Sequence, residues 1–302
     1  MTDYITSKQA VNSLSATPAQ SLTLDIDLLI QSVSQQIDLL TFDSSDVDTL
    51  QQLAHGFADE RESVHLRLIE LFGEIGEDAT PLLCQFMANH HNVRVRQACA
   101  QALARLGDPE AITPLVQALL TDHDPLIQSS VAGALARMGE EAVSALLRVM
   151  NCSSLSDAQK GQIAWALSCL GEDAASQIYA EIESGNPDVR CAVVGAIATL
   201  ARNTASEQAV QLLESSLDDP VLAVRLEAAS GLGQLSCHNA TARLVPLLND
   251  PEPEMRKTVA LALGTLKDPK AFRALQALVS DPSEIVRPVV EWAIQQYKTS
   301  RQ

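Results

Sequence analysis

Trp165 is the residue in this sequence best suited to recognition chemistry. It lies in a helical segment, and the segments before and after it carry glycine, Gly133 and Gly195, at the matching place. An indole with open space on both sides can anchor a partner protein or stack on a flat ligand. Two guanidinium groups, Arg105 and Arg137, follow one turn further along the preceding segments, where they can pair with carboxylates. An aromatic anchor beside arginine is typical of an interaction hot spot.

These places match because the chain repeats itself with a period of about 31 residues. One copy reads NVRVRQACAQALARLGDPEAITPLVQALL, and it returns as VLAVRLEAASGLGQLSCHNATARLVPLLND and PEMRKTVALALGTLKDPKAFRALQALVSD. Each copy predicts a long helix, a turn and a shorter helix. The long helices are expected to begin at Val64, Val95, Ile127, Gln159, Val189, Val224, Met255 and Val286. Each of these residues is offset zero, and the offset of a later residue in the same helix is its distance from it along the chain. One unit cannot bury its apolar face alone, which predicts an all-α, right-handed α-solenoid of about eight helical hairpins.

A charged pattern marks the turns before the long helices. In three units an aspartate is followed by proline and, six residues later, by an arginine. The pairs are Asp219 with Arg225, Asp250 with Arg256 and Asp281 with Arg287. The aspartate can cap the helix or pair with that arginine, and we expect a structural Asp–Arg ladder between units. The fourth unit departs from the pattern, with Ser154 in place of the aspartate and Lys160 in place of the arginine.

The same features resemble HEAT repeats, which share the Asp-to-Arg spacing, the Val-Arg opening of the long helix and a proline in some short helices (Pro81, Pro114, Pro246). The short period, the core from Ala100 to Gly107 and the D-P-x-A connection are similar to the HEAT-like repeats of phycobilisome lyases. The chain is most similar to cyanobacterial E/F-type bilin lyase relatives, over about residues 55–300. The resemblance is specific for fold and weakly specific for function, because such repeats host many tasks.

Helical geometry separates a core face from a groove face. Offsets 4, 7, 8 and 11 of the long helices are nearly always apolar, while offsets 3, 6 and 10 lie on the other side, which usually lines the concave groove of a solenoid. The predicted binding groove contains Gln101, Arg105, Gly133, Arg137, Gln162, Trp165, Cys169 and Gly195. The alternative is that Trp165 packs against a neighbouring helix while both arginines are solvated.

The N-terminal sixty residues differ from the repeats. Residues 1–20 are predicted to form a mobile tail because they are rich in Ser, Thr, Gln and Ala. Residues 21–60 are predicted to form acidic capping helices, one over residues 22–40 and one that reads DVDTLQQLAHGF and is capped by the segment from Asp43 to Asp46. Residues 61–302 are predicted to form the solenoid. The acidic end is typical of a solvated cap, and it can also dock a basic partner.

Composition excludes several classes of protein. The 302 residues hold 21 Lys and Arg against 38 Asp and Glu, a net charge of −17, which argues against a nucleic-acid partner. No stretch is apolar enough for membrane insertion, and the N-terminus lacks the apolar core of a secretory signal. We therefore expect a cytoplasmic protein.

The cysteines, the histidines and the short sequence motifs do not indicate a particular reaction. The six cysteines form no C-x-x-C pair and are expected to be reduced. His91 and His123 occupy the same turn position in consecutive units, near Asp122 and Asp124, but the spacing matches no established ligand set and no metal site is predicted. There is no G-x-S-x-G, P-loop or G-x-G-x-x-G motif, so the catalytic residues, if any, are unknown.

Two classes of function remain open. The absence of a catalytic motif favours a scaffold or chaperone-like adaptor that grips a client protein in its groove. The resemblance implies a bilin lyase or lyase subunit, which attaches or isomerises a phycobilin on a phycobiliprotein cysteine and often pairs with a second HEAT-like solenoid. Phycocyanobilin would then be a bound substrate, with its rings on Trp165 and its propionates on Arg105 or Arg137. Further alternatives are a regulator of phycobilisome disassembly or of an iron–sulfur carrier protein. No resident cofactor is predicted.

Overall fold

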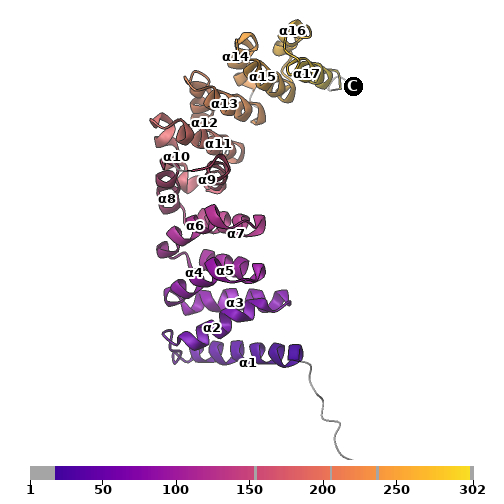
Figure 1. Ribbon diagram of the computed structural model, residues 1–302. Coiled ribbons are helices and arrows are strands. Elements are labelled where there is room, and N and C mark those ends of the chain that lie inside the picture. Colours follow the sequence, from indigo (N-terminus) through magenta and orange to yellow (C-terminus); the bar gives the residue numbers. More distant parts are fainter. Residues whose placement is uncertain (1–17, 153–154, 205, 236–237, 300–302) are drawn as a thin grey trace, which may run out of the picture.

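The structure, a computed structural model, describes residues 18–152, 155–204, 206–235 and 238–299. Within these ranges every regular element is an α-helix or a short 3-10 helix, and no strand occurs. Successive helices stack into a single curved row, with α1 (Pro18–Asp38) at one end and α17 (Arg287–Thr299) at the other (Figure 1). The predicted all-α solenoid is confirmed.

The row has two layers. Figure 1 shows the odd-numbered helices on the inner side of the curve and the even-numbered helices on the outer side. The inner helices before α17 are α3 (Glu62–Ile75), α5 (Val93–Leu106), α7 (Pro125–Arg137), α9 (Asp157–Cys169), α11 (Pro187–Thr204), α13 (Leu222–Gln234) and α15 (Pro253–Leu266). The outer helices are α2 (Val47–His55), α4 (Thr80–Asn89), α6 (Ile112–Thr121), α8 (Glu140–Met150), α10 (Ala175–Ala180), α12 (Glu207–Ser216), α14 (Thr241–Leu244) and α16 (Phe272–Ala277).

Most of the inner helices begin two residues before their predicted starts, and in α5, α7 and α9 a side chain upstream caps the first turn. The Asn92 side chain accepts a hydrogen bond from the Arg94 N–H at 2.9 Å, and Asp124 accepts one from the Leu126 N–H at 2.9 Å. Each cap satisfies an N–H group that the first turn of the helix leaves without a partner. The exception is α17, which begins at Arg287, one residue after the predicted position.

The N-terminal region is helical where the structure describes it. α1 begins at Pro18, within the last residues of the predicted tail, and residues 1–17 lie outside the described residues. α2 begins after Asp46, whose side chain accepts a hydrogen bond from the Thr49 N–H at 3.2 Å.

The core lies between the two layers. At offset 8 of the inner helices, residues from Phe72 to Leu263 have no exposed surface, and only Ile294 in the last helix is half-buried. Gly231 and Gly233 of α13 let neighbouring inner helices approach closely: a Cβ atom on Gly233 would lie 2.6 Å from the Ala262 Cα. This apolar core stabilises the stack, because each unit covers the face that its neighbour exposes.

The Asp–Arg ladder between units is present, but its pairing differs from the predicted one. Where an ion pair forms, the arginine pairs with the aspartate of the following unit, not with the carboxylate six residues before it. The bonds join Arg96 Nε to Asp122 Oδ2 (2.8 Å), Arg190 Nε to Asp219 Oδ2 (2.7 Å) and Arg256 Nε to Asp281 Oδ2 (2.8 Å).

Backbone groups complete the ladder. Arg225 and Arg256 donate to the carbonyl oxygens of Asp219 and Asp250, six residues earlier, at 2.9 and 2.8 Å. The Asp219 carboxylate also accepts the Val221 N–H at 2.8 Å, so the aspartate fixes the turn and does not cap the helix itself. Arg256, which also pairs with Asp281, thus connects the turns of two successive units.

The ladder makes the stability of the fold depend on pH. Hydrogen bonds from Arg190 and Arg256 hold the pKa values of the Asp219 and Asp281 carboxyls below the ordinary value of 3.8. Carboxyls with a lowered pKa in the folded state contribute stability that is complete above about pH 5 and is lost as the pH falls through the folded pKa. Urea titrations at falling pH should therefore show a falling midpoint, less steeply in an Asp219→Asn variant. A midpoint that stays constant down to pH 3 would contradict this assignment.

Candidate functional site

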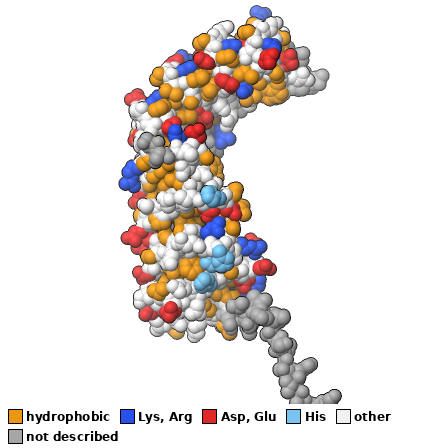
Figure 2. Space-filling model, in the orientation of Figure 1, with side chains coloured by type: hydrophobic (Ala, Val, Ile, Leu, Met, Phe, Trp, Pro, Cys, Tyr) orange, Lys and Arg blue, Asp and Glu red, His pale blue; other side chains and the backbone are white. Residues whose placement is uncertain are grey.

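The predicted groove residues all lie on inner helices of the stack. Figure 2 shows the hollow on the inner side of the curve, where α9, α11 and α13 lie. Trp165 is 41% exposed, so its indole is not packed away against a neighbouring helix. Gln162 and Gly195 are half-buried, and the other predicted residues are exposed: Gln101, Arg105, Gly133, Arg137 and Cys169.

The space on the two sides of Trp165 differs. A Cβ atom on Gly133 would meet no atom within 4 Å, whereas one on Gly195 would lie 2.9 Å from Oε1 of Glu227. The carboxyl group of Glu227 therefore lies over Gly195. The space predicted on the Gly195 side is present but narrowed, because a long side chain from the next helix, α13, reaches across Gly195.

The two arginines lie toward the N-terminal side of Trp165 and are supported by the backbone of their neighbours. Arg137 Nε donates to the Ala104 carbonyl oxygen at 3.0 Å, in the last turn of α5. A guanidinium is favourable there, because the carbonyl end of a helix carries partial negative charge. The aliphatic part of Arg105 covers Gly73, whose Cβ position is 3.0 Å from the Arg105 Cγ. Both guanidinium groups still reach solvent.

A cavity of about 340 Å³ opens beside Trp165 and is lined mainly by α9 and α11, with Glu227 from α13. It brings together two of the predicted residues, Trp165 and Gly195. The other predicted residues do not line it: Gln101, Arg105, Gly133, Arg137, Gln162 and Cys169. Polar residues that were not among the predicted groove residues also line it, including Lys160, Asp188, Cys191 and Glu227. Glu227 had a signal in the repeat pattern, because it is the one carboxylate at offset 3 of the long helices.

Charges within the cavity are partly neutralised. Lys160 Nζ lies 2.7 Å from Asp188 Oδ2, and this contact raises the pKa of the Lys160 ammonium. Burial raises the pKa of the Glu227 carboxyl. Burial, with smaller contributions from Glu227, Asp188 and Asp219, raises the pKa of the Cys191 thiol to about 11.

The cysteines on this surface are poor nucleophiles. A thiol with a pKa of about 11, as in Cys191, is protonated at neutral pH, and only the thiolate attacks efficiently. Burial also raises the pKa of the Cys169 thiol. The site can therefore bind and orient a ligand, but neither thiol is activated for covalent chemistry.

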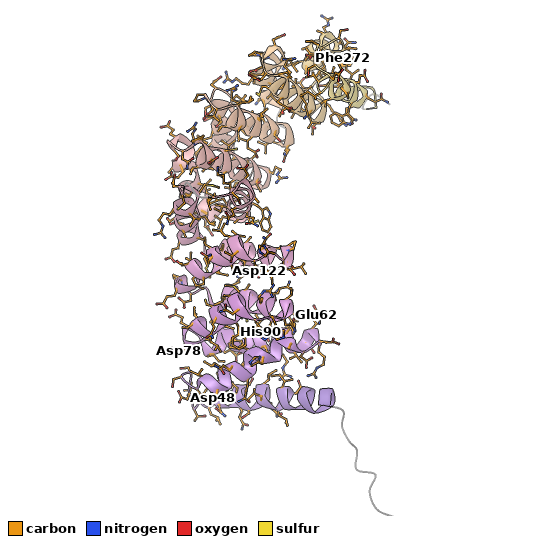
Figure 3. The ribbon with its side chains drawn as sticks, in the orientation of Figure 1. Asp48, Glu62, Asp78, His90, Asp122 and Phe272 are labelled. Atoms are coloured by element: carbon orange, nitrogen blue, oxygen red, sulfur yellow. The ribbon has the colours of Figure 1, made fainter. Side chains whose placement is uncertain are left out.

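A second cavity, of about 710 Å³, lies at the turns between α4 and α7 and includes His90, Asp122 and His123. Figure 3 shows His90 and Asp122 on neighbouring turns of the stack. Asp122 is engaged by Arg96, and His90 Nδ1 accepts the Asn92 N–H at 3.1 Å. No group of three or more His, Cys, Asp or Glu in the described ranges is arranged to hold a metal ion. These histidines are accounted for as polar turn residues.

Comparisons with known proteins identify a relative by sequence and solved structures with a similar fold. The chain is 33% identical over 83 residues to the bilin biosynthesis protein MpeU of Synechococcus sp. (strain WH8020), a match that spans 28% of each chain. The complex of CpcE and CpcF of phycocyanin lyase from Nostoc sp. PCC7120 is 22% identical, with a TM-score of 0.44, over 50% of this chain and 97% of that one. Kap121p is 13% identical, with a TM-score of 0.55, over 95% of this chain and 38% of that one, which shows a shared fold alone. No helix in the described ranges is long and apolar enough to cross a membrane.

A family model for HEAT repeats matches residues 47–136 and 218–295, more than half of the chain. The stretch between the two matches includes α8, α9 and α10, where the ladder is interrupted and the Trp165 cavity begins. The chain belongs to the HEAT-repeat family.

Proposed function

We propose that this protein is a scaffold that binds a client protein on its concave surface, with Trp165 as the anchor. The observation that carries the proposal is an exposed indole at the mouth of a cavity on the inner side of the solenoid. Buried aromatic anchors supply a large share of the binding energy in protein interfaces, and solenoids commonly bind partners on the concave side.

The partial match to a bilin biosynthesis protein supports a phycobiliprotein subunit as the client. The 83 matched residues are those of a bilin biosynthesis protein, so a protein that carries bilins is the partner class to test first. The match covers only 28% of that relative's length, so the client is proposed from sequence similarity over part of the chain. A second HEAT-like solenoid as an additional subunit belongs to the same proposal.

Replacing Trp165 by alanine is expected to weaken binding of an apo-phycobiliprotein subunit by at least about thirty-fold, because the loss of a hot-spot aromatic costs about 2 kcal/mol or more. Trp292 is the matched control: it occupies the same helical offset in α17 and is also 41% exposed. Isothermal titration calorimetry on the wild type and both single variants, with circular dichroism as a check on folding, gives the comparison. Equal losses in the two variants would contradict a site at Trp165.

A bilin lyase is the second candidate, and the local identity to the bilin biosynthesis protein favours it. In this function Trp165 would stack on the tetrapyrrole, and Arg105 and Arg137 would pair with its propionates. The raised thiol pKa values indicate that the thiolate that bonds to the bilin would come from the client. Incubation with phycocyanobilin and the apo-subunit separates the candidates: a lyase yields a covalent bilin adduct of the subunit, and a scaffold yields a complex without one.

The remaining alternatives stay predictions. No contact in the described ranges favours a regulator of phycobilisome disassembly or of an iron–sulfur carrier protein over the two candidates above.

A further inference from the structure

The cavity beside Trp165 holds one carboxyl group that its neighbours do not neutralise. Lys160 and Asp188 form an ion pair at 2.7 Å, so each offsets the charge of the other. Glu227 is half-buried and has neither an ion-pair partner nor a hydrogen-bond donor among the residues that the structure describes. In its ionised form Glu227 therefore leaves the cavity with one excess negative charge, and a partly buried carboxylate without a partner is costly.

Gly195 brings the carboxyl group and the indole to the same cavity. It forms part of the lining on α11, between Trp165 on α9 and Glu227 on α13. Because Gly195 has no side chain, the Glu227 carboxyl can lie over it, with Oε1 2.9 Å from the position that a Cβ atom would take. A group that enters here meets an aromatic ring and a carboxylate together. The nearby walls are apolar and include Met150, Ala164 and Ala192.

We propose that this cavity takes an arginine side chain of the client protein. The guanidinium would lie against Trp165 and pair with Glu227, while its aliphatic stem would contact the apolar walls. A guanidinium fits better than an ammonium, because its planar face stacks on aromatic rings and it is less strongly hydrated. The net charge of −17 also favours a basic partner. The inference rests on the proposed function, because it takes the client to bind on the concave surface.

Small probes test the cavity without any client. In a Trp292→Phe background Trp165 is the one remaining tryptophan of the two in the chain, so its fluorescence reports on the site. The probes are N-acetyl-arginine amide and its neutral isostere N-acetyl-citrulline amide, each titrated to about 100 mM at constant ionic strength. We expect a saturable change with the arginine probe and binding about ten-fold tighter than that of the citrulline probe.

Glu227→Gln keeps the shape of the side chain and removes its charge, so it should abolish the preference for arginine over citrulline. Glu207→Gln, an exposed change on the outer helix α12, should retain that preference. The proposal is overturned if the arginine probe does not bind, if the two probes bind equally to the wild-type cavity, or if Glu227→Gln keeps the preference. Selective arginine binding together with a failure to bind the phycobiliprotein subunit would instead count against the proposed client alone.

Discussion

Replacement of Asp219 by alanine is expected to lower the free energy of unfolding by about 3 kcal/mol, because it leaves a largely buried arginine without its partner. The Arg190 and Asp219 side chains are only 14% and 10% exposed, and their atoms lie 2.7 Å apart. The change also removes the acceptor for the Val221 N–H, which holds the turn before α13. Both losses fall at the junction between the fifth and sixth units.

The adjacent residue supplies a matched control. Asp218 also pairs with an arginine, Arg243, at 2.6 Å, but its side chain is 71% exposed. An exposed pair of this kind contributes less than about 1 kcal/mol, since water and salt screen it. Urea denaturation of Asp218→Ala and Asp219→Ala, followed by circular dichroism, measures the difference. Similar losses in the two variants would show that the ladder has no special structural role.

Gly233→Ala is expected to destabilise the protein by about 1 to 3 kcal/mol, the cost of overpacking a tight helix contact. The added Cβ would lie 2.6 Å from both the Cα and the Cβ of Ala262, and a backbone atom cannot move aside as a flexible side chain can. The inner helices α13 and α15 would have to separate. Such a separation would also expose apolar surface between the sixth and seventh units.

Gly133→Ala is the matched comparison and should have the opposite sign. Gly133 lies within α7, and an added Cβ would meet no atom within 4 Å. Alanine is favoured over glycine in an open helical position by up to about 1 kcal/mol. Thermal unfolding of the two variants under identical conditions gives the signs. A stabilised Gly233→Ala variant would mean that the helices are not in the close contact described here.

The repeat made much of the fold predictable from sequence. Offsets counted along one helix transfer to every other helix, so the buried face from Phe72 to Leu263 followed directly from the pattern. The ladder was predicted as a set of charges, but its pairing was not. Six residues separate Asp219 from Arg225 along the chain, whereas Arg190 of the preceding unit reaches the Asp219 carboxylate across the stack.

The candidate site was predictable only in part, for a related reason. Sequence offsets place each Cα on a face, and they placed Trp165 and Gly195 on the same surface. They do not show which neighbour a long side chain covers. Glu227 reaches back over Gly195, Lys160 pairs with Asp188, and Arg137 bonds to the backbone of α5. Each of these contacts depends on the path of a flexible side chain between helices.

Hydrogen–deuterium exchange with and without an apo-phycobiliprotein subunit tests the central claim, which is that the concave surface around Trp165 binds the client. We expect slower exchange in peptides from α9, α11 and α13, with α10 and α12 on the outer layer unchanged. Slower exchange confined to the outer helices, or no change at saturating subunit, would contradict this claim.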